Sequence, residues 1–127
     1  VRDMAPGTGG SHGPQIPFAV VIRDTAHPVT MGMPATWMHV KDELYDSLRG
    51  PAVNMQVLAT AYCTKTKRHE PMMLAIDYGK GRVFYTALGH REEVWANPLF
   101  LKHVRGGLRY ALGLDKADAS PRPAPAK

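Results

Sequence analysis

Apolar runs of strand length are the clearest pattern in the chain. Residues 18–22 (FAVVI) form an unbroken apolar run, which predicts a strand buried on both faces. A second strand is predicted over residues 55–62 (MQVLATAY). Residues 72–77 and 82–88 flank the turn sequence YGKG, whose two glycines tolerate positive φ. The pattern therefore predicts a β-hairpin in the second half of the chain.

The pattern over residues 36–48 (TWMHVKDELYDSL) fits two structures. Val40, Leu44 and Leu48 recur at helical spacing, whereas Trp37 and Tyr45 suit a strand equally well. The adjacent carboxylates at 42 and 43 point to different faces in either structure, so they are not expected to form a close acid–base pair. A solvated face and a single carboxylate directed into a cleft both remain open.

The last predicted element is a helix that starts at Pro98. Asn97 is a favoured N-cap residue, Pro98 suits the first helical position, and Gly113 suits the end. The glycine pair at 106–107 would let another element approach closely. The spacing predicts that one face is an apolar stripe, formed by Phe100, Val104, Leu108, Ala111 and Leu112.

Composition indicates one soluble globular domain. The chain has 127 residues, of which 44% are apolar and 21% charged. Residues 1–17 are rich in glycine and proline and read as a loop or disordered start, and residues 115–127 as a disordered Pro/Ala-rich tail. No apolar run is long enough for a membrane span. Because the sequence starts with Val1, the compartment stays open: cytoplasmic, or secreted with the signal lost.

Charge and cysteine content exclude some functions. The net charge of +5 is modest, and aromatic residues do not alternate with the basic ones, so no nucleic-acid partner is expected. Cys63 is the only cysteine, which rules out an internal disulfide and a cysteine-based zinc cage. Its basic neighbours favour a thiolate, but no histidine is clearly placed as its base.

Two histidines follow predicted strands. His27 precedes Pro28 and is therefore held extended just beyond the first strand. His90 follows Gly89 at the end of the hairpin, where α/β sheets commonly place their chemistry. The structural alternative is that His90 only caps its strand.

Several motifs in order resemble the ThuA-like (trehalose utilisation) domain. They are HPVTMGMP at 27–34, DELY at 42–45, YGKGRVFYTALGH at 78–90, and the helix that follows. The resemblance covers about residues 9–114. It implies the fold of class I glutamine amidotransferases, a flavodoxin-like three-layer α/β sandwich. Only the second half of such a domain is expected here, over residues 18–114.

The resemblance also implies a role in carbohydrate metabolism, around trehalose or a related disaccharide or keto-sugar. A hydrolase and an isomerase are both open, whereas a glutaminase is not expected because no nucleophilic cysteine is matched. The alternative is a non-catalytic binding or assembly module, completed by a partner chain or by a second copy.

Site residues are assigned with this resemblance in mind. The catalytic candidates are His90, His27 and Glu43. The candidates for contacts to the sugar are His12, Asp42, Tyr45, Arg91 and Trp95. Three imidazoles suffice for zinc or another divalent metal, so His12, His27 and His90 form a candidate metal site, with two histidines and Glu43 as the alternative set.

Overall fold

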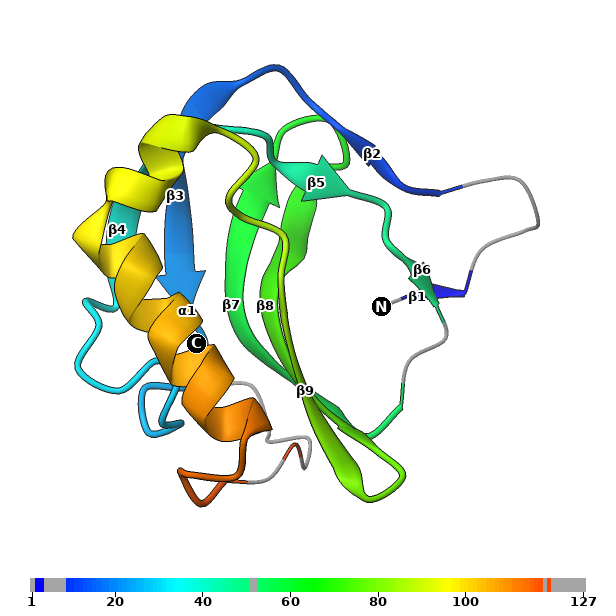
Figure 1. Cartoon of the computed structure of the whole chain (residues 1–127). Helices are drawn as coiled ribbons and strands as arrows, with labels where there is room; N and C mark the ends of the chain where they lie inside the picture. The colour runs from blue at the N-terminus through cyan, green and yellow to red at the C-terminus, as the bar shows by residue number, and fades with distance from the viewer. Residues whose placement is uncertain (1, 4–8, 51–52, 118, 120–127) are drawn as a thin grey trace.

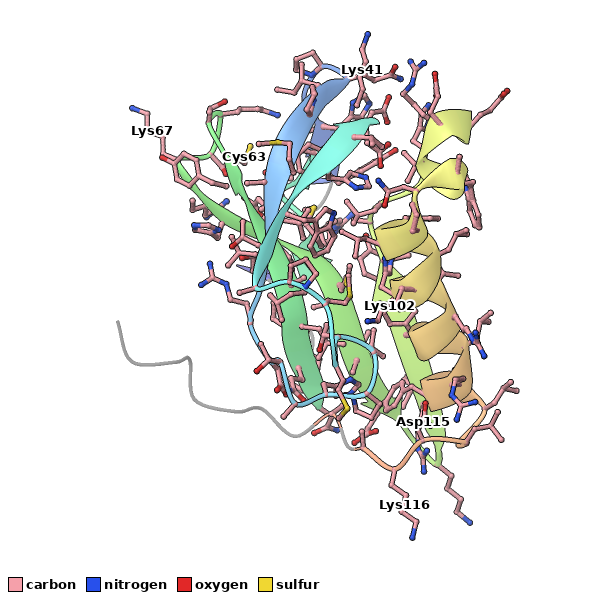
Figure 2. The ribbon with its side chains drawn as sticks, turned by 90° about the vertical axis from the view of Figure 1, so that its left-hand side faces the viewer. Lys41, Cys63, Lys67, Lys102, Asp115 and Lys116 are labelled. Atoms are coloured by element: carbon pink, nitrogen blue, oxygen red, sulfur yellow. The ribbon has the colours of Figure 1, made fainter. Side chains whose placement is uncertain are left out.

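Five antiparallel strands form the main sheet, in the order β4-β3-β7-β8-β9. A computed structural model describes residues 2–3, 9–50, 53–117 and 119. The strands are β3 (Ile16–Ile22), β4 (Thr36–Asp42), β7 (Met55–Cys63), β8 (Arg68–Tyr78) and β9 (Gly81–Thr86). The sheet curls strongly, and helix α1 (Pro98–Ala111) lies against one of its faces (Figures 1 and 2). The chain therefore has an α/β fold, as predicted.

Short elements complete the description. β1 (Arg2–Asp3) pairs in parallel with β6 (Arg49–Gly50), and β2 (Ser11–His12) pairs antiparallel with β5 (Tyr45–Asp46). The 3-10 helix η1 (Glu92–Ala96) links β9 to α1. Two strands thus lie within the predicted loop of residues 1–17. Of the predicted tail, Ala119 is described and is buried, while most of the other residues lie outside the described part.

The ambiguous stretch 36–48 contains the strands β4 and β5 and no helix. Trp37 and His39 are buried on one side, and Met38 between them is 66% exposed. This alternation is that of a strand with one covered face. Pairing with β3 over residues 36–42 decides the structure, because cross-strand neighbours and burial of Trp37 and His39 outweigh the helical spacing of Val40 and Leu44.

The strand at 18–22 exists, but the prediction that both of its faces are buried is wrong. Phe18, Val20 and Ile22 are buried, whereas Ala19 between them is exposed. The reason is that α1 covers a single face of this antiparallel sheet in the described part of the chain (Figure 2).

The predicted hairpin is confirmed. β8 and β9 pair up to Tyr78 and Gly81, which leaves Gly79 and Lys80 as the turn. Gly79 has φ +60°, a conformation that glycine adopts without steric cost.

The ends of α1 are also confirmed. The side chain of Asn97 accepts hydrogen bonds from the backbone N–H groups of Leu99 and Phe100 at 2.9 and 3.2 Å. Gly113 has φ +72° just beyond the helix. Both ends are therefore set by residues next to the helix.

The predicted apolar stripe on α1 is confirmed for Phe100, which is buried, and for Val104, which packs partly buried against the core, but it is wrong for the residues nearer the end of the helix. Leu108 and Leu112 are 60% and 73% exposed. A Cβ on Gly107 would lie 1.9 Å from Cδ1 of Phe84, and a Cβ on Gly106 would lie 2.9 Å from Cα of Val29. The glycines allow the close approach that was predicted, and the face of α1 that carries them therefore packs against the core. The buried residues of the helix are Phe100, His103, Gly106, Gly107 and Tyr110.

A side-chain contact ties α1 to the loop between β3 and β4. Lys102 donates from Nζ to the carbonyl oxygen of Gly32 at 2.6 Å, and Figure 2 labels this lysine on the helix. Among the described residues, no helix is long and apolar enough to cross a membrane.

Candidate functional site

Glu43 is the centre of a cluster of polar side chains directly after β4. Its carboxylate accepts hydrogen bonds from the hydroxyl of Tyr45 at 2.9 Å and from Nε2 of Gln15 at 3.2 Å. Nδ1 of His90 lies 3.5 Å from its Oε2 atom, and Nδ1 of His12 lies 3.7 Å from the same oxygen. The Glu43 side chain is 8% exposed, whereas the imidazoles are about half exposed, so ligands in solvent can reach the histidines.

Pairing of two short strands brings His12 to this cluster. His12 stands opposite Tyr45 in the β2–β5 pair, and their ring centroids are 5.3 Å apart. Backbone hydrogen bonds from Gly10 to Ser47 and from Gly13 to Leu44 extend the pairing on both sides. Figure 1 shows β2 and β5 side by side next to the main sheet. The cluster thus joins residues from distant parts of the sequence.

Electrostatics keep Glu43 ionised. The hydrogen bond from Gln15, the hydrogen bond from Tyr45 and the nearby imidazoles of His12 and His90 lower the pKa of Glu43, although partial burial opposes them. The bond to the carboxylate raises the pKa of Tyr45, whose hydroxyl therefore stays protonated. Glu43 is accordingly a carboxylate that accepts hydrogen bonds at neutral pH and is not a proton donor.

A pocket of about 250 Å³ adjoins this cluster. Burial raises the pKa of Tyr85 in its wall, which keeps that phenol neutral. The volume lies just below the usual range of sites for small molecules. Its lining consists of Tyr45, Tyr85, Thr86, Ala87, Leu88 and His90.

Asp42 points into the protein and not into the pocket. Its side chain is fully buried and accepts hydrogen bonds from Nε2 of His39 at 3.0 Å and from the backbone N–H groups of Gly89 and His90 at 2.9 and 3.2 Å. The predicted direct contact between Asp42 and a sugar therefore needs correction, because no solvent reaches this carboxylate. The two adjacent carboxylates do point to different sides.

His27 does not join the other histidines, which corrects its assignment as a catalytic residue and metal ligand. It is fully buried, its Nδ1 accepts from the N–H of Val29 at 3.2 Å, and its ring lies 5.1 Å from that of Tyr110. Tyr110 is in the last turn of α1, whereas Gly89 packs against Phe100 in the first turn. Ten helical residues separate the two contacts, which is roughly 15 Å.

The candidate metal sites do not fit either. No group of three or more histidine, cysteine or acidic side chains within the described ranges could hold a metal ion. The set of His12, His27 and His90 is therefore wrong, and the alternative set with Glu43 has no support.

Arg91 and Trp95 are not among the residues that line the pocket. Arg91 donates to Oε1 of Gln15 at 2.6 Å and also pairs with Glu93, whereas Trp95 donates from Nε1 to the carbonyl oxygen of Gly89 at 3.1 Å. The ring of Trp95 packs on Phe100 and does not line the pocket.

Sequence reasoning missed three residues of this region, namely Gln15, His39 and Tyr85. His39 and Tyr85 lie on strands, where their place in the alternation could have indicated them. Gln15 lies within the glycine- and proline-rich segment 1–17 and gave no signal.

Fold and site together define a class: an α/β domain with a small pocket beside a carboxylate flanked by two histidines. The chain belongs to the ThuA family, described as trehalose utilisation, whose model matches residues 2–111. No curated protein matches the chain.

Two solved structures show the extent of the similarity. A ThuA-like protein from Parabacteroides merdae is 38% identical, with a TM-score of 0.72, over 87% of this chain and 44% of that protein. A ThuA-like protein from Bacteroides uniformis is 21% identical, with a TM-score of 0.61, over 87% of this chain and 48% of that protein, and shows the fold alone. The chain thus spans less than half the length of either protein.

Proposed function

We propose that the pocket beside Glu43 binds a carbohydrate of the trehalose type, a related disaccharide or a keto-sugar. The observation that carries this proposal is the convergence of His12, His90 and Tyr45 on the Glu43 carboxylate at a solvent-accessible pocket. The family's description, trehalose utilisation, supports the same class of ligand.

The residues have separate roles in this proposal. The ionised Glu43 accepts hydrogen bonds from sugar hydroxyls, and the rings of Tyr45 and Tyr85 offer apolar surface to the faces of the sugar ring. His90 lines the pocket and is half exposed, so its imidazole can give or take a proton from a bound hydroxyl or carbonyl. The reaction would be a hydrolysis or an isomerisation.

The complete domain is proposed to be a flavodoxin-like sandwich of which this chain supplies the second half. The chain covers 44% of the Parabacteroides merdae protein, with 38% identity, and this supports the proposal. The proposed site would then gain further walls from the remaining half, in keeping with the small volume of the pocket.

Binding of trehalose and of a keto-disaccharide, followed by calorimetry and by NMR chemical shifts, tests the sugar proposal. His90→Ala should weaken binding at least tenfold, because it removes a pocket wall and a hydrogen-bonding group. His69→Ala is the matched control, since His69 is also exposed but lies on β8 beside Thr60 and Tyr62. Equal affinity in wild type and His90→Ala would refute the assignment.

A second candidate function is assembly with another copy of the chain. Leu101, Leu108 and Leu112 share one side of α1 and are 46%, 60% and 73% exposed. Light scattering after size exclusion tests this candidate. A dimer that Leu108→Glu dissociates supports it, and a folded monomer at all concentrations rejects it.

A further inference from the structure

The loop that carries His90 is held by a buried carboxylate from another strand. Asp42 at the end of β4 accepts from the N–H groups of both Gly89 and His90, at 2.9 and 3.2 Å. Its side chain is fully buried, so solvent does not compete for these bonds. Two successive amides bound to one carboxylate fix both the position and the direction of the backbone at His90.

His39 supplies a third donor to the same carboxylate. Its Nε2 lies 3.0 Å from Oδ2 of Asp42, and both side chains are fully buried. The carboxylate can only accept, so Nε2 carries the proton. Nδ1 of His39 has no hydrogen-bond partner among the described residues, so the bond to Asp42 is the hydrogen bond that orients this ring.

Gly89 is held from further sides. Its carbonyl oxygen accepts from Nε1 of Trp95 at 3.1 Å, and its φ of +111° favours glycine. A Cβ at this position would lie 2.7 Å from Cζ of Phe100. The backbone before His90 therefore has little freedom as long as Asp42 holds its N–H groups.

We propose that Asp42, oriented by His39, is a positioning residue that sets His90 against Glu43. This inference rests on the proposed function of the Glu43 site and deepens it. Asp42 accepts a hydrogen bond from the backbone N–H of His90, and Oε2 of the neighbouring Glu43 lies 3.5 Å from Nδ1 of the His90 imidazole. One strand end thus controls both the backbone and the ring of His90.

Amide hydrogen exchange in the full chain tests the first step. Asp42→Asn replaces one accepting oxygen with an N–H donor, so exchange at Gly89 and His90 should rise at least tenfold. Glu70→Gln is the matched control, because Glu70 is a buried carboxylate that bonds Thr66 and Arg68 in the β7–β8 hairpin. Exchange at Gly89 and His90 within twofold of wild type in Asp42→Asn would overturn the proposal.

The pKa of the Glu43 carboxyl, measured by carbon NMR, separates positioning from general destabilisation. The nearby His90 contributes to lowering this pKa, so His90→Ala should raise it. If Asp42 positions His90, His90→Ala should raise this pKa in the wild-type background and leave it nearly unchanged in the Asp42→Asn background. The charge lost with Asp42 is absent from both members of the second pair and cancels in the comparison, so an equal rise in the two backgrounds overturns the inference.

Variants of His39 keep the test decisive if Asp42→Asn does not fold. His39→Leu removes the donor to Asp42 and should raise exchange at Gly89 and His90, whereas His39→Gln retains an N–H and should restore most of the protection. Equal exchange in the two variants would contradict a role for His39.

Sugar binding distinguishes the two proposals. If the wild-type chain binds no sugar but Asp42→Asn frees the His90 loop and abolishes the effect of His90→Ala on the pKa of Glu43, the proposed function fails and the positioning role stands. If sugar binds to wild type and Asp42→Asn binds it equally well, the positioning role fails alone.

Discussion

His103 should make the protein less stable in mild acid. This residue is fully buried on α1, where its ring lies between those of Phe84 and Phe100, at centroid distances of 5.9 and 4.8 Å. Its Nε2 lies 3.2 Å from the hydroxyl of Thr86. Burial lowers the pKa of His103 from 6.5 to about 4, and the neighbouring His39 adds to the shift.

The sign and the size follow from linkage between proton binding and folding. Between pH 6.5 and about 4, the unfolded chain binds a proton at His103 that the native protein does not bind. The free energy of unfolding should therefore be highest above pH 6.5 and fall as the pH drops. The loss amounts to about 2 kcal/mol at pH 5 and about 3 kcal/mol at pH 4.

Urea unfolding at pH 7, 6, 5 and 4.5 measures this loss. His103→Gln removes the titrating group but keeps a polar side chain near Thr86. Between pH 7 and 5, the free energy of unfolding of this variant should therefore fall by about 2 kcal/mol less than that of the wild type. Thr86→Val is the control, because it changes stability without removing a titrating group. A pH dependence of His103→Gln equal to that of wild type would refute the reasoning.

Three further predictions concern the helix and the site. Gly107→Ala should gain about 1 kcal/mol from helix propensity but should destabilise the fold by more, roughly 1–3 kcal/mol or above, because the added Cβ would lie 1.9 Å from the Phe84 ring. Thermal unfolding measures the net loss of stability, and a higher Tm than wild type contradicts the prediction. Asn97→Ala should cost about 1 kcal/mol in the same assay, since two N–H groups lose their cap. The pKa of Glu43 is lowered in the folded protein, so the contribution of its carboxylate to stability is complete above pH 4.5 and is lost as the pH falls through the pKa of the folded state. In urea unfolding, Glu43→Gln should therefore lose less stability below pH 4.5 than the wild type. An equal loss in the two proteins rejects the ionised carboxylate.

Local chemistry explains which parts of the fold could be predicted from the sequence. The turn at Gly79 and the helix ends at Asn97 and Gly113 depend on residues next to them, so the pattern of neighbours was sufficient. The helix face was not predictable in this way. It depends on Val29 and Phe84, which meet the glycine pair only in the folded chain.

In the candidate site too, local sequence identified some residues correctly, whereas others depend on tertiary packing. His90 was a candidate because it follows a predicted strand, and Glu43 because it lies in the DELY motif of the family resemblance, and the structure brings them together. His27 had an equally good local signal, yet the loop after β3 buries it against Tyr110. A pattern along the chain identifies side chains capable of chemistry, but it does not show at which end of the helix each of them lies.

The end of β4 explains how two adjacent acidic residues come to have different roles. Successive side chains of an extended chain point to opposite sides, so Asp42 bonds the buried His39 while Glu43 turns to Tyr45 and the imidazole of His90. A slip of one residue in the β3–β4 pairing would exchange the two carboxylates, leave the amides of Gly89 and His90 without their acceptor, and bury Glu43. The pairing of Phe18 with His39 and of Ile16 with Asp42 fixes the register, and the irregularity between these two pairs lies directly before the site. The geometry at His90 therefore depends on the register of β4 as much as on the hairpin that precedes it.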